Sequence, residues 1–408
     1  MSVTLKLVLS GRMLVTLLMG FSSGLPLLLT GSVLQAWMKD ENVDLGTIGL
    51  FALVGLPYAL KFLWAPLTDR FVLFGIGRRR GWLLVVQLML VTAVALLGSA
   101  TPARDTFSVA FIAMLVTLFS ATQDIVIDAY RREALSDREL GLGASLYVNG
   151  YRVGMLVASG GGLILADIVP FRTVYQLMAI LMLIGPVTTL FAPEPVTEGG
   201  TPASLREAVT QPFVDYFRRS DAVLILLFIL LYKVGDTMAT SMTTPFYLEM
   251  GFSKTEIGAI VKLFGFGATM LGSLAGGLIM LRIGIHHALG WFGVLQGLST
   301  LSFAVLALQG HNLMLLAAVV ALENFSGGMG TSAFVAFMAS ITNKKFTATQ
   351  YALLSSLMGV PRVLIAAPTG FLAENVGWVA FFVICALVAV PGLLVLVRLR
   401  YWRQEPRD

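Results

Sequence analysis

The stretch APEPVTEGGTPASLREAVTQPFVDYFRRS, residues 192–220, is the longest polar stretch of a chain that is otherwise strongly apolar. Of the 408 residues, 57% are hydrophobic and 12% are charged, and the mean hydropathy is +0.84. A chain of this composition has too few polar side chains to cover a water-soluble globule. We therefore predict an integral membrane protein in which residues 192–220 lie outside the bilayer.

Apolar segments of transmembrane length flank this stretch on both sides. A hydrocarbon layer of ~30 Å requires about 20 apolar residues per helix. Six such segments precede residues 192–220 and six follow them. The twelve predicted transmembrane helices lie near residues 12–34, 46–66, 82–100, 107–130, 142–166, 173–192, 222–244, 255–280, 286–309, 313–340, 347–373 and 377–399.

This pattern predicts an all-α integral membrane protein with twelve transmembrane helices in two six-helix bundles. Residues 1–192 are expected to form the N-terminal bundle, and residues 222–408 the C-terminal bundle and a short tail. Residues 193–221 are expected to form a linker between them. Ser204 and Glu207 have the spacing of a capping box, so a short amphipathic helix is expected within this linker.

The distribution of Lys and Arg predicts the orientation of the chain, because positively charged loops stay in the cytoplasm. With both termini inside, the cytoplasmic loops and ends hold 19 basic residues and the outer loops hold only 4. Both termini are therefore expected to be cytoplasmic. The net charge of +5 then reflects topology and anionic lipid headgroups, and we expect no nucleic-acid partner.

The sequence gives no sign of a cofactor or metal site. The single cysteine, Cys385, excludes an internal disulfide and a Cys-based metal centre. The three histidines, His286, His287 and His311, fall at predicted helix ends. No cofactor is expected, and no enzymatic activity.

The two halves of the chain resemble each other. DLGTIGLF at 44–51 and SKTEIGAI at 253–260 each open the second helix of their half, and Arg152 and Arg362 lie 210 positions apart. Two parallel six-helix repeats joined by a linker are the plan of the major facilitator transporters.

A loop signature agrees with this plan. The usual Gly-x-x-x-Asp-Arg of that superfamily appears in APLTDRFVLFGIGRRRGW, residues 65–82, as Asp69 and Arg70, and the second half keeps Arg282. These three residues are predicted to gate the cytoplasmic side, through an acid that pairs reversibly with basic groups and helix dipoles. The later run of arginines at 78–80 is expected to be mainly topogenic.

Polar side chains inside the predicted helices form the candidate site, because a charge within a helix bundle usually faces water or an opposite charge. Proton coupling requires acids, and the candidates are Asp124, Asp128, Asp236 and Glu323. Substrate binding requires cations and hydrogen-bonding groups, and the candidates are Gln123, Asn149, Arg152, Lys61, Lys233, Lys262, Asn324, Thr237 and Thr240.

Several of these residues have two interpretations. Asp124 and Asp128 share a helix face, and Arg152 on the next helix can meet either one. Such a pair is either a proton switch, released when the arginine turns to an anionic substrate, or a permanent structural bridge. The threonines of the seventh helix either bind substrate or bond back to their own helix carbonyls. For the glycines of the tenth helix we favour close helix packing over binding.

Long motifs in both halves resemble the AmpG muropeptide permeases of Gram-negative bacteria. They include GFSSGLPLLLTGSVLQAWM at 20–38, SATQDIVIDAYRREAL at 120–135 and ENFSGGMGTSAFVAFM at 323–338. The resemblance implies a multi-pass protein of the bacterial inner membrane, driven by the proton motive force. It also implies that Gly24, Gly150 and Gly327 lie in sensitive regions.

The same resemblance implies the partners. The cargo would be N-acetylglucosaminyl-1,6-anhydro-N-acetylmuramic acid, with or without its peptide, imported for cell-wall recycling. In that family, import also feeds the induction of β-lactamase. Protons and membrane lipids are the other expected partners, and the protein is expected to be a monomer.

Three other functions would each have a different signature. A transporter of acyl-CoA or lipid would favour a dense basic cluster in its cavity, whereas the cations here are scattered. An intramembrane aspartyl protease would carry Tyr-Asp and Gly-x-Gly-Asp, whereas this chain has Asp128-Ala129-Tyr130 and Gly235-Asp236 after Val234. A receptor that does not transport would show no proton-dependent flux after reconstitution.

Overall fold

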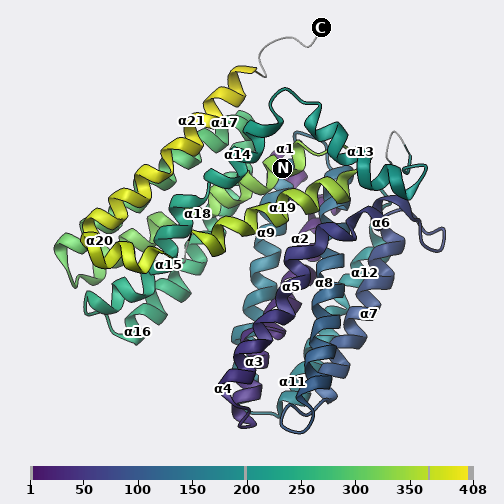
Figure 1. Ribbon diagram of the computed structural model, residues 1–408, viewed down its shortest axis with the longest axis horizontal. Helices are drawn as coiled ribbons and strands as arrows, with labels where there is room; N and C mark the ends of the chain where they lie inside the picture. The colour runs from purple at the N-terminus through teal and green to yellow at the C-terminus, as the bar shows by residue number, and fades with distance from the viewer. Residues whose placement is uncertain (1–2, 197–199, 366–367, 403–408) are drawn as a thin grey trace. The chain divides into compact units, whose positions relative to one another are not determined.

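The structure, a computed structural model, describes residues 3–196, 200–365 and 368–402 (Figure 1). Across these ranges every regular element is helical and no strand occurs. The side chain of Arg362, the predicted counterpart of Arg152, lies outside the described part.

Nine helical stretches within the described residues are long and apolar enough to cross a membrane. They are Gly11–Asp40, Leu45–Leu63, Arg80–Ser99, Thr106–Ala134, Phe171–Phe191, Ala222–Glu249, Lys254–Gln309, Leu313–Ser340 and Thr369–Leu399. The prediction of an all-helical membrane protein is therefore confirmed.

The chain divides into two compact units. The N-terminal unit comprises Met1–Phe213 together with Ala339–Ser356, and the C-terminal unit comprises Val214–Met338 and Leu357–Asp408. The first division falls inside the polar stretch 192–220. The segment Ala339–Ser356 also belongs to the N-terminal unit, although it lies far along the chain. It runs from the end of one helix into the first half of the next.

The N-terminal unit contains the helices drawn from purple to blue in Figure 1. Their bounds are α1 Val3–Val8, α2 Gly11–Leu29, α3 Ser32–Asp40, α4 Leu45–Leu50, η1 Phe51–Gly55, α5 Leu56–Leu60, η2 Lys61–Leu63, α6 Ala65–Arg70, α7 Arg80–Ser99, α8 Thr106–Ala134, α9 Leu140–Leu156, η3 Val157–Gly161, α10 Gly162–Ala166, α11 Phe171–Met182 and α12 Ile184–Phe191. The linker helix α13, Leu205–Phe217, follows them and begins with the expected bond from the Glu207 N–H to Ser204 Oγ.

Glycines allow α2 and α9 to pack with their backbones in contact. A methyl group at Gly24 would lie 2.0 Å from the carbonyl oxygen of Tyr151, and one at Gly150 would lie 2.0 Å from that of Leu17. A methyl group at Gly154 would lie 2.3 Å from the carbonyl oxygen of Phe21 in α2. These separations require glycine, as in the small-residue interfaces of other membrane helices.

The C-terminal unit contains the elements from α14 onward. Their bounds are α14 Ala222–Leu231, α15 Val234–Glu249, α16 Lys254–Glu256, η4 Ile257–Phe264, α17 Gly265–Gln309, α18 Leu313–Ser340, α19 Thr347–Leu364, α20 Thr369–Val388 and α21 Val390–Trp402. The ends of α18 and the first turns of α19 belong to the N-terminal unit. Aromatic rings fill the core of the C-terminal unit, where the ring centres of Phe246, Phe303 and Phe382 lie within 6.2 Å of one another.

Two long helices of this unit are interrupted at single glycines. Gly284 in α17 has φ 76° and ψ 164°, and Gly377 in α20 has φ 75° and ψ 163°. Only glycine adopts this conformation without strain. The break at Gly284 falls in the gap predicted between segments 255–280 and 286–309, and the break at Gly377 falls at the first residue of the segment predicted at 377–399.

The glycines of α18 pack against α17, as the sequence analysis favoured. A methyl group at Gly328 would lie 2.3 Å from the carbonyl oxygen of Thr269. One at Gly327 would meet Gln296 at an ordinary 3.7 Å. The close-packing requirement therefore applies to Gly328 and not to Gly327.

Candidate functional site

The first polar group lies in the N-terminal unit, on one face of α8. Asp124 and Asp128 are both buried there, at 7% and 5% exposure. Lys61, in η2, is also buried, and its charge acts on both carboxylates. The described interactions thus place Lys61, which sequence analysis assigned to substrate binding, beside the two acids.

Ten buried polar atoms among the described residues of this unit have no hydrogen-bond partner. Five of them belong to side chains other than arginine on α2, α5, α8 and α9. They are the hydroxyls of Ser23, Tyr58 and Ser120, Asp124 Oδ1 and Asn149 Oδ1. The charge of Asp124 acts on Tyr58, so acid and phenol belong to one group. Buried polar atoms are normally satisfied, so this set is suited to a polar ligand or to water.

Asp128 forms an ion pair with Arg131, whose Nη2 lies 3.0 Å from Asp128 Oδ1. The same Nη2 donates to the hydroxyl of Tyr351 at 3.0 Å, and the guanidinium lies 4.6 Å from the ring centre of Tyr147. Arg131 is therefore held on several sides. The predicted pairing of Arg152, half-buried on α9, with Asp124 or Asp128 stays a prediction.

Two predicted substrate ligands of this unit bind the protein itself. Gln123 is fully buried, donates to Ser22 O at 3.1 Å and accepts from Ser22 Oγ at 3.2 Å. It therefore connects α8 to α2. The Asn149 amide donates to Ser145 O at 3.0 Å, which leaves its oxygen available.

A second polar group lies in the C-terminal unit. Lys233 Nζ lies 3.2 Å from Asp236 Oδ2 and 3.1 Å from Gln296 Oε1. Glu323 on α18 contacts the buried hydroxyl of Ser299 at 2.5 Å. Lys233, Asp236 and Glu323 are candidate residues that the sequence predicts, whereas Gln296 and Ser299 are not.

Other predicted residues of this unit lie apart from that group. Asn324 is bonded within the protein, since its amide donates to Val320 O and its oxygen accepts from Thr269. Thr237 is half-buried on α15 and Thr240 is exposed. The remaining two predicted residues, Lys262 in η4 and Arg282 in α17, are also exposed.

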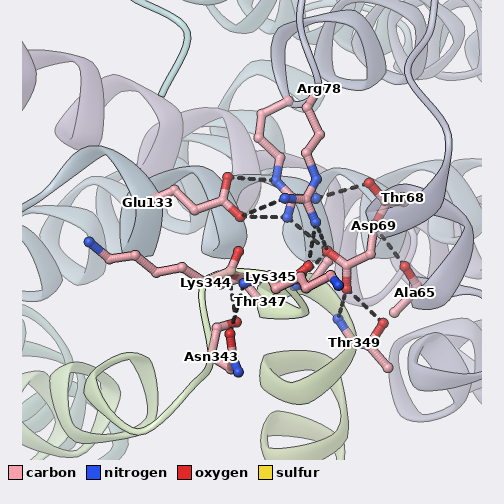
Figure 2. Close-up of polar contacts among 12 residues, drawn as sticks. Ala65, Thr68, Asp69, Arg78, Glu133, Asn343, Lys344, Lys345, Thr347 and Thr349 are labelled. Carbon is pink, nitrogen blue, oxygen red and sulfur yellow. Dashed lines mark hydrogen bonds and ion pairs between the residues drawn. The ribbon is translucent and has the colours of Figure 1, made fainter. Parts of the chain in front are cut away.

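A third group, at the ends of helices in the N-terminal unit, surrounds Asp69 (Figure 2). Its carboxylate is fully buried and lies 3.0 Å from Arg78 Nη2 and 2.8 Å from Arg79 Nη2. It also accepts from the backbone N–H and hydroxyl of Thr349, at 2.8 and 2.7 Å. Asp69 thereby caps the N-terminus of α19, where a negative charge is favoured.

Glu133 completes this group from the end of α8. It binds Arg79 through two contacts of 2.9 and 2.6 Å, and Figure 2 shows it facing Arg78 and Asp69. Burial disfavours the charged form of Arg79, but the carboxylates of Glu133 and Asp69 outweigh that effect and raise its pKa. Arg79 is therefore a permanent cation between two acids.

These contacts correct one part of the sequence analysis and leave another untested. Arg70, predicted to gate together with Asp69, lies over the ring of Phe71 at 5.6 Å, and its gating role stays a prediction. Arg78 and Arg79, expected to be mainly topogenic, are the buried partners of Asp69. The signal that was available is Glu133 in YRREAL, an acid next to two arginines at the end of a transmembrane helix.

Comparison with known proteins relates these features to a family. The model of the Major Facilitator Superfamily matches residues 13–366 and 236–408. The anhydromuropeptide permease of Escherichia coli strain K12 is 45% identical over 388 residues, which are 95% of this chain and 79% of that protein. A Rickettsia felis transporter that carries the name AmpG 4 is 33% identical, over 95% of this chain and 96% of its own.

Solved structures agree on the fold. The crystal structure of the major facilitator transporter FucP, in the outward conformation, has a TM-score of 0.72 at 11% identity and covers 97% of this chain and 100% of its own. The fold and the relatives are those of transporters and not of enzymes, and they describe a multi-pass protein of the bacterial inner membrane. The chain belongs to the major facilitator superfamily and, within it, to the AmpG family of permeases.

Proposed function

We propose that the protein imports anhydromuropeptides from the periplasm to the cytoplasm, driven by the proton gradient. The cargo is N-acetylglucosaminyl-1,6-anhydro-N-acetylmuramic acid, alone or with its peptide. The observation that carries this proposal is the 45% identity, over 95% of the chain, to a relative named for the same substrate class.

The polar groups of the N-terminal unit suit this cargo. It presents hydroxyls, N-acetyl groups and a lactyl carboxylate. The unpartnered atoms of Ser23, Tyr58 and Asn149 match the hydroxyls and amides. Lys61 is a buried cation that can attract the carboxylate. Arg152, and Lys233 of the C-terminal unit, are further candidates for this role.

The topology proposed for this function has twelve membrane crossings and two cytoplasmic ends. The 56-residue stretch Lys254–Gln309 is too long for one crossing and is broken at Gly284, so it counts as two. The helical runs Leu140–Ala166 and Thr347–Leu364 add the fifth and the eleventh crossings. The excess of basic residues in alternate loops supports the orientation.

Alternating access is proposed to use the Asp69 group as its cytoplasmic lock. In the proposed topology, the loop before α7 and the loop before α19 both face the cytoplasm. Asp69, with Arg78 and Arg79, fastens the start of α19 to helices of the N-terminal unit. Release of these contacts would free the cytoplasmic end of the pathway.

We propose that the protein works as a monomer without a cofactor. The proton motive force supplies the energy, and the candidate carriers remain Asp124, Asp128, Asp236 and Glu323. Asp124 is the first to test, because it is buried beside Lys61 with an oxygen that has no hydrogen-bond partner.

The test is uptake of labelled disaccharide anhydromuropeptide into proteoliposomes. Wild type and Asp124→Asn are compared under an imposed proton gradient and in gradient-free counterflow. We expect the variant to lose gradient-driven uptake and keep counterflow. Wild type that transports labelled acyl-CoA and not muropeptide would refute the substrate assignment.

A further inference from the structure

Two acids and one cation form a membrane-embedded group in the C-terminal unit. Lys233 is paired with Asp236 at 3.2 Å. Among the described residues, the charged groups that act on Glu323 are Asp236 and Lys233. Tyr247 on α15 and Cys385 on α20 also feel the charge of Glu323, and both are neutral in their ordinary state.

The charges of this group do not balance when both acids are ionised. Lys233 contributes one positive charge, while Asp236 and Glu323 contribute two negative charges. The corresponding group of the N-terminal unit does balance, because Asp124 and Asp128 face Lys61 and Arg131. A net charge inside a membrane bundle is costly, so the C-terminal group favours the uptake of one proton.

Geometry indicates which acid holds that proton. Asp236 already accepts from the ammonium of Lys233, and its side chain is 26% exposed. Glu323 instead contacts Ser299, which is completely buried. Both acids are half-buried, and an ionised carboxylate is stabilised better beside a cation than beside a neutral hydroxyl. The proton therefore belongs on Glu323.

The hydrogen bonds around Ser299 agree with a neutral Glu323. Ser299 Oγ lies 2.8 Å from Gln296 O, 2.5 Å from Glu323 Oε2 and 2.8 Å from Ser326 Oγ. Ser326 Oγ in turn lies 3.0 Å from Glu323 O. The two serine hydroxyls offer two hydrogens for these four contacts. A protonated carboxyl supplies a third.

We propose that Glu323 carries one proton in this conformation, and that this proton is coupled, together with Asp124, to the transport proposed above. Gln296 and Ser299 act as positioning residues. Gln296 holds Lys233 toward Asp236, with its Oε1 3.1 Å from the ammonium, and Ser299 holds the carboxyl of Glu323. The coupling inference rests on the proposed function, whereas the protonation of Glu323 does not.

Infrared spectroscopy of the purified protein tests the protonation directly, because a protonated carboxyl group absorbs separately from a carboxylate. At neutral pH we expect a protonated-carboxyl band in wild type that Glu323→Gln removes. Asp236→Asn should also remove it, because Lys233 and Glu323 then balance. Lys233→Met should double the band, because two protons are then needed. The matched control Glu374→Gln replaces an exposed glutamate of the same unit and should leave the band unchanged.

Each outcome decides the proposal. A band that persists in Glu323→Gln, or that does not respond to Lys233→Met and Asp236→Asn, overturns it. If Glu323→Gln does not fold, the opposite responses of Asp236→Asn and Lys233→Met still decide the charge balance.

Proteoliposome uptake separates the protonation of Glu323 from the proposed transport function. Wild type without muropeptide uptake but with the expected infrared pattern refutes the function and leaves the protonation standing. Wild type that transports, with gradient-driven uptake intact in Glu323→Gln, refutes the coupling role.

Discussion

Replacing Asp69 by asparagine should release the start of α19 from the N-terminal unit. The carboxylate accepts from both arginines and from the first turn of α19, so every neighbour of its two oxygens is a donor. Asparagine has nearly the same shape, but one of its terminal atoms is itself a donor. The substitution therefore removes a negative charge and turns one attractive contact into a repulsive one.

The size of the effect follows from the burial of the group. Breaking a buried ion pair typically costs about 3–5 kcal/mol, because the remaining charge is left without compensation. Arg79 keeps its two contacts with Glu133, so we take the lower end, about 3 kcal/mol. At 1.4 kcal/mol per factor of ten, the released form should gain roughly a hundredfold in relative population.

Hydrogen–deuterium exchange measures this release. The amides of Ala348 and Thr349 donate to Asp69, and exchange of a peptide containing them should accelerate by about the same factor in Asp69→Asn. The control is Asp137→Asn. Its carboxylate lies 2.7 Å from Arg132, but the side chain is 80% exposed, so a surface effect below about 1 kcal/mol is expected. Equal protection of α19 in Asp69→Asn and in wild type would refute the assignment of Asp69 as a lock.

Three further predictions concern the backbone and the linker. Gly150→Ala should destabilise the protein by about 1–3 kcal/mol in thermal melts, because its methyl meets a carbonyl oxygen of α2 at 2.0 Å; Gly161→Ala, with no atom within 4 Å, should not. Gly284→Ala should cost about 1–3 kcal/mol although space is available, because φ is 76°. The hydrogen bond from Lys345 lowers the pKa of Glu207, so this contact is intact at neutral pH and is lost as pH falls below the usual range of a glutamate. Proteolysis of the linker should accelerate at that low pH in wild type, and should be fast at both pH values in Glu207→Gln.

The sequence predicts the class of the protein and much of its helix pattern, because these depend on composition and on local backbone preference. Apolar segments must be helical in a membrane, since every backbone group needs an internal partner. The separation of segments 255–280 and 286–309 coincides with the break at Gly284, and that of 347–373 and 377–399 ends at the break at Gly377. Charged residues within such segments are also readily recognised, because the residues around them are apolar. Asp124 and Glu323 were predicted as site residues on this basis.

The partners of those charges depend on tertiary contacts, which spacing along the chain does not encode. The sequence predicts that Asp69 pairs with basic groups and helix dipoles, but spacing along the chain does not identify which ones. The donors that reach Asp69 come from the next loop and from a helix 279 or more residues away.

The residue before α19 explains why Asp69 binds at the start of that helix. Phe346 precedes its first residue and has no side-chain acceptor, so the free N–H groups of that turn need an acid from elsewhere. Glu194 serves α7 in the same way, accepting from the N–H groups of Arg79 and Arg80 at 2.8 and 3.0 Å. At the starts of α7 and α19, a distant carboxylate thus replaces the missing capping residue.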